Sequence, residues 1–205
     1  MQPVARPPLR LVEPAAAVSQ RREFDELARR PVSRVTVEPV ETDEISDLLA
    51  FAAREIPVLS TATAAVTRVV NRNRESVYVF RRGGRPVGIY AMLHLSKDGL
   101  EALLLDEFNT AVPDPHCLVA TGEPPVAIYK WAVVAPGPAA QGIYRISHLL
   151  QADRYATANL FARPTTAGGE RIMRNLGFEK VGPAGRDLHR YVRLANRTGH
   201  LVEAE

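Results

Sequence analysis

The sequence predicts a mixed α/β protein (α+β) whose central, mostly antiparallel sheet is flanked by helices. Three observations lead to this fold class. Runs rich in β-branched residues alternate along the chain with runs of helical spacing. Two adjacent glycines, Gly83 and Gly84, separate two β-rich runs, which indicates an antiparallel hairpin. Within residues 126–162 a strand, a helix and another strand follow one another, and such an order requires a parallel connection.

The first 33 residues are expected to form a mobile arm, and residues 34–205 a single domain. Residues 1–18 are rich in Pro and Ala and show no periodicity. Ser19 can cap a short helix that Pro31 ends. A chain of 205 residues is typical of one domain with an appended tail.

The domain is predicted to begin with a strand and two helices. Arg34–Glu38 alternates polar and apolar residues, which indicates a half-buried strand. Thr42 is a suitable N-cap, and the apolar residues behind it recur at helical spacing until Pro57. A second helix is predicted over Thr61–Asn71, with its valines pointing inward.

The middle of the chain is predicted to hold the hairpin and a long loop. The hairpin strands are Ser76–Arg81 and Pro86–Met92. The apolar run Leu100–Leu105 fits either a strand or a helix. The polar, Pro-containing segment from Asn109 to Pro125 is too long for a tight turn, so we expect a loop on the substrate side of the domain.

The last third of the chain is predicted to contain three strands and two helices. In order, these are strand Val126–Val134, helix Ile143–Tyr155, strand Ala158–Ala162, helix Ala167–Asn175 and strand Tyr191–Leu194. Val126–Val134 is the most strand-like run of the chain. Thr166 can cap the last helix, and Gly177 can end it in a left-handed conformation.

Composition argues against several classes of protein. The one cysteine, Cys117, rules out an internal disulfide framework and fits a reducing compartment, so we expect a cytoplasmic protein. The five histidines lack metal-ligand spacing, so no metal is expected. No run approaches the roughly 20 apolar residues of a membrane span, and prolines and Glu13 interrupt the N-terminus where a secretion signal would be apolar. A net charge of +3 without a recognition motif argues against nucleic acid as a partner.

The stretch VAPGPAAQGIY, residues 134–144, lies between the most strand-like run and a predicted helix. Small residues at a helix N-terminus let a phosphate approach the backbone N–H groups. Together with the closing helix, this stretch resembles the signature of the GNAT superfamily of N-acetyltransferases, a valine-rich strand that leads into V-x-P-x-x-[RQ]-x-x-G-x-[GA]. The residues in register are Val134, Pro136, Gly142 and Ile143, and Leu176–Gly177–Phe178–Glu179 match the closing element. In element order the resemblance extends over residues 34–194.

The resemblance implies a GNAT-like acyl-CoA N-acyltransferase fold with acetyl-CoA (acyl-CoA) as co-substrate. The backbone of Val133 and Val134 would pair with the amide-bearing pantetheine arm, much like an added strand. The pyrophosphate would lie against a cradle of Ala139, Ala140, Gln141, Gly142, Ile143 and Tyr144.

Three positions depart from the family pattern. Ala139 stands at the [RQ] position and Tyr144 at the final [GA] position, where its side chain can either point outward or fill the phosphate volume. The family often has a tyrosine four residues before the closing glycine as general acid, and Met173, which stands there, cannot donate a proton. The candidate acid is Tyr144, with solvent as the alternative. The candidate base is Glu107, because families of this fold sometimes place a base after such an apolar run; the simpler interpretation of Asp106–Glu107 is a solvated strand end.

Several other polar side chains have both a structural and a functional interpretation. Tyr129 and Lys130 point to opposite faces of their strand, so either one of them meets the acceptor or Tyr129 is core and Lys130 reaches solvent. Adjacent His116 and Cys117 point apart in an extended segment, which argues against a catalytic dyad. Arg163 either binds an anionic substrate or forms a surface ion pair.

The resemblance implies transfer of an acetyl group from acetyl-CoA to a primary amine, on a small molecule or on a protein. Two alternatives stay open. The chain could be an inactive GNAT-fold binding or regulatory module, since a fold does not by itself establish an activity. It could also take longer acyl chains from an acidic acyl-carrier protein, which its basic balance would suit. Neither nucleic acid nor a membrane is expected as a partner, and a homodimer stays open.

Overall fold

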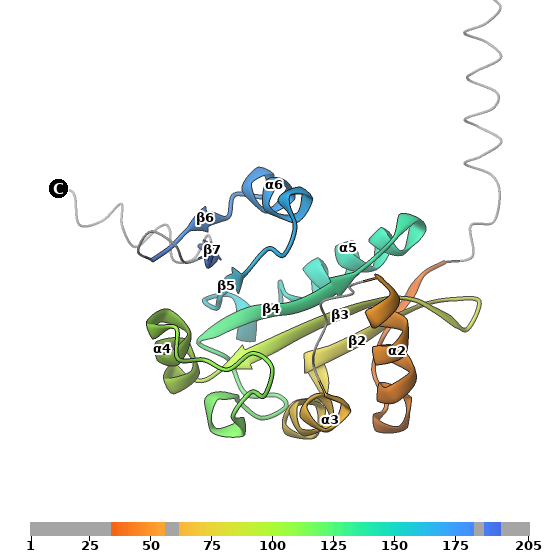
Figure 1. The fold of residues 1–205 in the computed structure, drawn as a ribbon, viewed down its shortest axis with the longest axis horizontal. Helices are drawn as coiled ribbons and strands as arrows, with labels where there is room; N and C mark the ends of the chain where they lie inside the picture. The colour runs from red at the N-terminus through yellow and green to blue at the C-terminus, as the bar shows by residue number, and fades with distance from the viewer. Residues whose placement is uncertain (1–33, 56–61, 183–186, 194–205) are drawn as a thin grey trace, which may run out of the picture. The chain divides into compact units, whose positions relative to one another are not determined.

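The structure is a computed structural model, and it describes residues 34–55, 62–182 and 187–193 (Figure 1). The predicted arm of residues 1–33 and its short helix lie outside the described residues. The helices are α2 Ile45–Glu55, α3 Thr63–Arg72, α4 Lys97–Leu105, α5 Ala140–Leu149 and α6 Ala167–Asn175. The short 3-10 turns are η1 Thr42–Glu44, η2 Arg74–Ser76, η3 Pro115–Cys117, η4 Gly137–Ala139 and η5 Asp153–Tyr155. The strands are β1 Thr36–Pro39, β2 Val77–Arg82, β3 Arg85–Leu95, β4 Ala127–Val134, β5 Asn159–Ala162, β6 Glu179–Lys180 and β7 His189–Tyr191.

One sheet organises the domain, with the strand order β1-β2-β3-β4-β5-β7-β6. Only β4 and β5 run parallel, and α5 connects them; all other neighbouring strands of this sheet are antiparallel. The predicted mixed, mostly antiparallel sheet is therefore confirmed.

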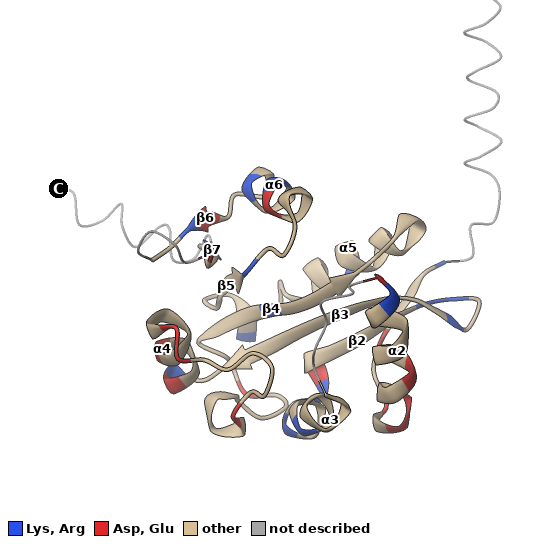
Figure 2. Ribbon diagram, in the orientation of Figure 1, with Lys and Arg blue, Asp and Glu red and all other residues tan. Residues whose placement is uncertain are grey.

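Helices cover both faces of the sheet. On one face α5 packs against a core that includes Phe80, Met92 and Ile128. On the other face α2, α3 and α4 cover two adjoining clusters, around Val79 and Leu93 respectively. Figure 1 shows α2 and α5 on opposite sides of the strands. Apolar side chains thus point both ways from each central strand, while most charged residues lie on the helices, the loops and the β2–β3 hairpin (Figure 2).

The hairpin forms where the two glycines predict it. Gly83 and Gly84 have φ angles of 58° and 77°, and positive φ at both central residues is what a two-residue turn matched to the strand twist requires. Strand β3 extends beyond the predicted Met92 to Leu95, because its last residues stay paired with the first residues of β4.

Several helix boundaries differ from the predicted ones. Glu41, not Thr42, precedes the first helical turn, and it forms a capping box with Glu44. The ambiguous run around residues 100–105 is helix α4, which begins after Ser96, whose hydroxyl accepts a hydrogen bond from the Gly99 N–H at 3.2 Å. Sequence period alone could not separate strand from helix in so short an apolar run.

The helix after the glycine-containing loop begins at Ala140 and ends at Leu149, rather than at the predicted Ile143 and Tyr155. It starts early because η4 continues directly into it. Tyr155 lies in a separate turn, buried, with its hydroxyl donating to Glu75 Oε2 at 2.9 Å. The last helix, α6, has the predicted bounds and caps, with Thr166 at its start and Gly177 at φ 84° after its end.

Within the described residues, no helix is both long enough and apolar enough to cross a membrane.

Candidate functional site

The parallel pair β4–β5 separates halfway along β4. Residues Ala127–Lys130 pair with Asn159–Ala162, whereas β3 pairs with β4 as far as Val134. In the described part of the chain, no strand pairs with the other edge of β4 from Trp131 to Val134. An unpaired edge presents backbone N–H and C=O groups, so an amide-bearing ligand can lie along it as an added strand.

A β-bulge lies at the point of separation. Ala91 pairs with Ala132 but Met92 pairs with Lys130, so Trp131 is an extra residue on β4. Both Trp131 and Ala132 pack on the face that α2 covers. The Trp131 indole donates a hydrogen bond to the Thr110 carbonyl at 2.8 Å, which holds the 109–125 loop against this strand.

The N-terminus of α5 follows directly on the unpaired edge. Pro136 leads into η4, and Gly137 adopts a left-handed φ of 51°. Of the predicted cradle residues, Ala140, Gln141 and Tyr144 are exposed, Ile143 is half-buried, and Ala139 and Gly142 are buried. The first backbone N–H groups of a helix lack partners within the helix and carry partial positive charge. In this loop, however, the Ala139 N–H already donates to the Pro136 carbonyl at 3.1 Å, the Ala140 N–H donates to the Gly137 carbonyl, and Pro138 has no N–H. An anion at this end of the sheet would therefore meet the positive end of the helix rather than a row of unpaired N–H groups.

The Tyr144 side chain points away from the protein. It is 68% exposed, and its ring meets the His148 ring edge-on one helical turn later, with centroids 4.5 Å apart. Of the two orientations considered from the sequence, the outward one is observed. The ring does not occupy the space at the start of α5, so the departure at this position leaves the backbone approachable.

Two glycines allow α5 and β3 to enclose Phe80. A Cβ atom on Gly142 would lie 2.5 Å from the Phe80 ring. A Cβ atom on Gly88 would lie 2.8 Å from the same ring and 2.7 Å from the Val134 carbonyl oxygen. Gly142 thus serves close packing of the helix on the sheet, a role that the motif alone did not indicate. Because Gly88 lies in β3, the contact also brings the basic β2–β3 hairpin to this end of β4 (Figure 2).

Comparison with known proteins identifies the fold. No protein-family model matches the chain, and no curated protein matches its sequence. Among solved structures, the loading GNATL domain of CurA from Lyngbya majuscula matches with a TM-score of 0.56 and 14% identity, over 78% of this chain and 98% of that domain. The protein has the GNAT fold. The predicted resemblance is thereby confirmed at the level of architecture.

Two further solved structures with this fold are more distant. An aminoglycoside acetyltransferase in complex with coenzyme A matches with 15% identity and a TM-score of 0.47, over 82% of this chain and 99% of that one. An acetyltransferase from Streptococcus agalactiae matches with 13% identity and a TM-score of 0.45, over 78% and 98% of the two chains.

Lys130 is the ionisable residue closest in sequence to the point where β4 and β5 part in this GNAT fold. It is half-buried, and its ammonium lies 4.6 Å from the centroid of the Phe178 ring instead of extending into solvent. Burial, and secondarily Arg193, lowers the pKa of Lys130 to about 8. Met173, at the family's usual acid position, packs against the core on the same face. Tyr129 points to the other face and is buried beside Phe108, a core residue as its simpler reading predicts.

Glu107 lies just after α4, where Asp106 ends the helix in a left-handed conformation with φ 66°. Glu107 is exposed, and the neighbouring Asp106 forms an ion pair with Arg163 at the end of β5. Of the two interpretations of Arg163, the ion pair is the one observed. Helices α4 and α5 cover opposite faces of the sheet, so the structure does not bring Glu107 and Tyr144 together.

The 109–125 loop offers no nucleophile of high reactivity. Burial, with Asp114 and Asp98, raises the pKa of the Cys117 thiol, which lowers its thiolate fraction. Across residues 34–55, 62–182 and 187–193, no three His, Cys, Asp or Glu side chains are grouped in a way that could hold a metal ion.

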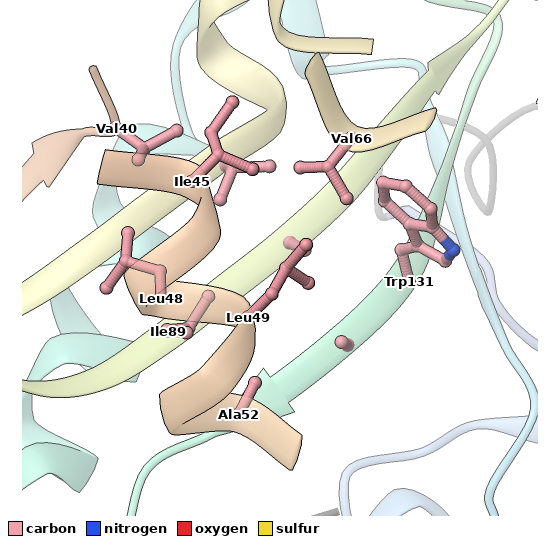
Figure 3. A pocket seen from close by; sticks show the side chains of 11 residues that line it. Val40, Ile45, Leu48, Leu49, Ala52, Val66, Ile89 and Trp131 are labelled. Carbon is pink, nitrogen blue, oxygen red and sulfur yellow. The ribbon is translucent and has the colours of Figure 1, made fainter. Parts of the chain in front are cut away.

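An apolar hollow lies between α2, α3 and the sheet (Figure 3). The space between its walls, about 470 Å³, includes open solvent and is not the volume of a closed cavity. Its lining consists of Val40, Ile45, Leu48, Leu49, Ala52, Val66, Val77, Ile89, Ala91, Trp131 and Ala132. The last two are the bulge residues of β4, so the hollow adjoins the unpaired edge from the face opposite α5.

Proposed function

We propose that the protein is an acyl-CoA-dependent N-acyltransferase, most simply one that moves an acetyl group from acetyl-CoA to a primary amine of a small molecule or a protein. The observation that carries the proposal is the unpaired edge of β4, which ends at the N-terminus of α5. A pantetheine arm needs a hydrogen-bonding strand edge and a pyrophosphate is favoured at the positive end of a helix, and this site offers one directly after the other along the chain.

The proposed binding roles follow the two parts of the site. The backbone of Val133 and Val134 pairs with the pantetheine amides, and the backbone from Ala139 to Tyr144 binds the pyrophosphate. The outward orientation of the Tyr144 ring supports this role. Arg82 and Arg85, on the hairpin that reaches this end of β4, add positive charge for an anionic donor.

The proposed chemistry is direct transfer. The amine nitrogen attacks the thioester carbonyl, whose oxygen is polarised by a backbone N–H of β4 near Val134. The C–S bond breaks as the amide forms, and the amine loses a proton to water or to a carboxylate such as Glu107. The departing thiolate takes a proton from Lys130. We assign this last role to Lys130 rather than to Tyr144, because the Tyr144 ring is turned to solvent.

Titration of acetyl-CoA into the full chain by calorimetry tests the proposal. A micromolar dissociation constant is expected, and a hundredfold excess over that constant should stabilise the fold by about 2.7 kcal/mol. Absence of both binding and thermal stabilisation at millimolar ligand would contradict the proposed donor site. Binding without turnover on any amine would instead favour the inactive binding module.

A pair of charge variants localises the donor. Gln141→Glu places a carboxylate in the exposed first turn of α5, where it favours the helix but repels a pyrophosphate, so affinity should fall at least about tenfold. Ser147→Glu adds the same charge on an exposed position two turns later and should leave the affinity nearly unchanged. Equal effects of the two variants would place the donor elsewhere.

A further inference from the structure

The apolar hollow differs from an ordinary gap in a core by its position. Most of its lining residues are buried, but Leu49, Trp131 and Ala132 are partly exposed, so we place the mouth of the hollow beside them. Trp131 and Ala132 are the two residues at which β4 bulges and loses its neighbour β5. The mouth of the hollow therefore lies on the same strand as Val134 and two residues before it, close to the backbone that would polarise the thioester carbonyl.

The hollow runs across the sheet. Its floor is formed by Ala132 of β4, Ala91 and Ile89 of β3, and Val77 of β2, which are three neighbouring strands. Neighbouring strands lie about 4.8 Å apart, so the floor extends roughly 10 Å from the bulge. Helices α2 and α3 form the opposite wall through Leu48 and Val66, among others. The floor is therefore longer than an acetyl group.

The lining decides which part of a substrate fits. All eleven lining side chains are hydrophobic, and none carries a charge or can accept a proton; the one aromatic ring, Trp131, lies at the β4 bulge. A primary amine is protonated near neutral pH and would lose its hydration here without replacement, which is costly. An alkyl chain, by contrast, gains free energy from leaving water.

From the hollow's apolar lining and its mouth at the β4 bulge, we propose that it binds the acyl chain of the donor, so that the preferred substrate is an acyl-CoA longer than acetyl-CoA. The inference rests on the proposed acyltransferase function and refines its donor. The carbonyl and the thioester lie along β4 between the bulge and Val134, and the hydrocarbon chain extends under α2 towards β2. The amine approaches from outside the hollow, where it keeps access to solvent.

Calorimetry with a chain-length series tests this inference. Coenzyme A, acetyl-CoA, butyryl-CoA, hexanoyl-CoA and octanoyl-CoA are titrated into the full chain. Affinity should rise with length, by up to about fourfold for each methylene group that becomes buried, and then level off. Equal affinity along a series in which coenzyme A itself binds would overturn this inference and leave the proposed function standing. Failure of every member to bind would overturn both.

Two variants away from β4 show whether the chain lies in the hollow. Ala52→Leu on α2 narrows it, and should reduce the ratio of octanoyl-CoA to acetyl-CoA affinity at least tenfold while coenzyme A binds as before. Leu49→Ala widens the mouth at a partly exposed position that tolerates truncation, and should move the optimum to a longer chain. Leu104→Ala, exposed on α4 and outside the hollow, is the matched control. An unchanged length profile in both hollow variants would overturn the inference.

A last experiment distinguishes whether the hollow binds the acyl donor or the amine acceptor. Turnover is compared for ethylamine and octylamine with acetyl-CoA, and for acetyl-CoA and octanoyl-CoA with ethylamine. The inference requires the larger effect of length in the donor series. A larger effect in the amine series would assign the hollow to the acceptor and overturn it.

Discussion

Lys130 and Tyr144 show how the surroundings of a residue determine its usable chemistry. Both could donate a proton in principle. The Tyr144 ring lies in solvent against His148, whereas the Lys130 ammonium is held over Phe178 beside the opening of the sheet. A pKa near 8 keeps the Lys130 ammonium acidic enough to transfer its proton at the pH of most assays.

Replacing Lys130 tests its proposed role through the pH profile. Lysine must be protonated to act as the acid, so wild-type kcat should fall as the pH rises through about 8. Lys130→Met should lower kcat by roughly 10²-fold and remove the fall of kcat above about pH 8, with little change in KM. Lys130→Arg keeps the positive charge but not the lowered pKa, so its kcat should also be low and should not fall as the pH rises through about 8, with coenzyme A affinity unchanged. A Lys130→Met enzyme with the wild-type pH profile would contradict the assignment.

At the level of elements, the distance between α5 and the sheet is set by a glycine. Gly142 lies against Phe80, whose side chain is fully buried between α5 and β3. Interiors are packed to near-crystalline density, so there is no free volume into which the ring could move cheaply. The same contact fixes the start of α5 relative to the end of β4, and so links packing to the shape of the cradle.

Gly142→Ala should therefore destabilise the protein, although alanine is the better helix former. The added Cβ would lie 2.5 Å from the Phe80 ring, so we expect a loss of about 1–3 kcal/mol in the free energy of unfolding, measured by urea titration. Gly168→Ala in α6 is the matched control, since a Cβ there meets nothing within 4 Å. It should be neutral or stabilising by up to about 1 kcal/mol. If both variants changed the free energy of unfolding equally, the Phe80 ring would have moved to make room for the added Cβ, and this prediction would be wrong.

At the scale of the whole molecule, a partly buried cluster of polar side chains links segments that are distant in the sequence. Glu75 of η2 accepts from Arg154 at 2.6 Å and from the Tyr155 hydroxyl at 2.9 Å, both in η5. His94 of β3 packs against the Tyr155 ring, and its Nε2 has no hydrogen-bond partner among the described residues. Burial lowers the pKa of His94 to about 4.

This histidine makes the fold sensitive to acid. Between pH 6.5 and 4 the unfolded chain binds a proton at His94 that the folded chain excludes, so stability falls as the pH falls through this window and the effect levels off below it. The shift corresponds to about 3 kcal/mol. His94→Gln should flatten the dependence of unfolding free energy on pH between 7 and 4.5, and the exposed His148→Gln should not. Identical slopes in all three proteins would contradict this account.

Local sequence predicted most of the architecture because its signals are local. The Gly83–Gly84 pair requires a hairpin, Thr166 and Gly177 bound α6, and the β-branched run becomes β4. The predictions from sequence failed where a contact with a residue far along the chain determines the local structure. Tyr155 fits a helical pattern but bonds to Glu75, and β6 has only two residues, held by β7. The sequence of one segment does not show which distant residues it will contact.

The sequence by itself determined the fold class, the place of the glycine-containing loop before α5 and the absence of a tyrosine at position 173, since each follows from residue types at fixed spacing. Only the tertiary structure decided that the Tyr144 ring faces solvent, that Gly142 makes room for Phe80, and that Lys130 lies over Phe178. It alone placed the β4 bulge beside an apolar hollow built from three strands and two helices. The physical reason is that side-chain direction and burial depend on neighbours from distant parts of the chain, which spacing along the sequence does not encode.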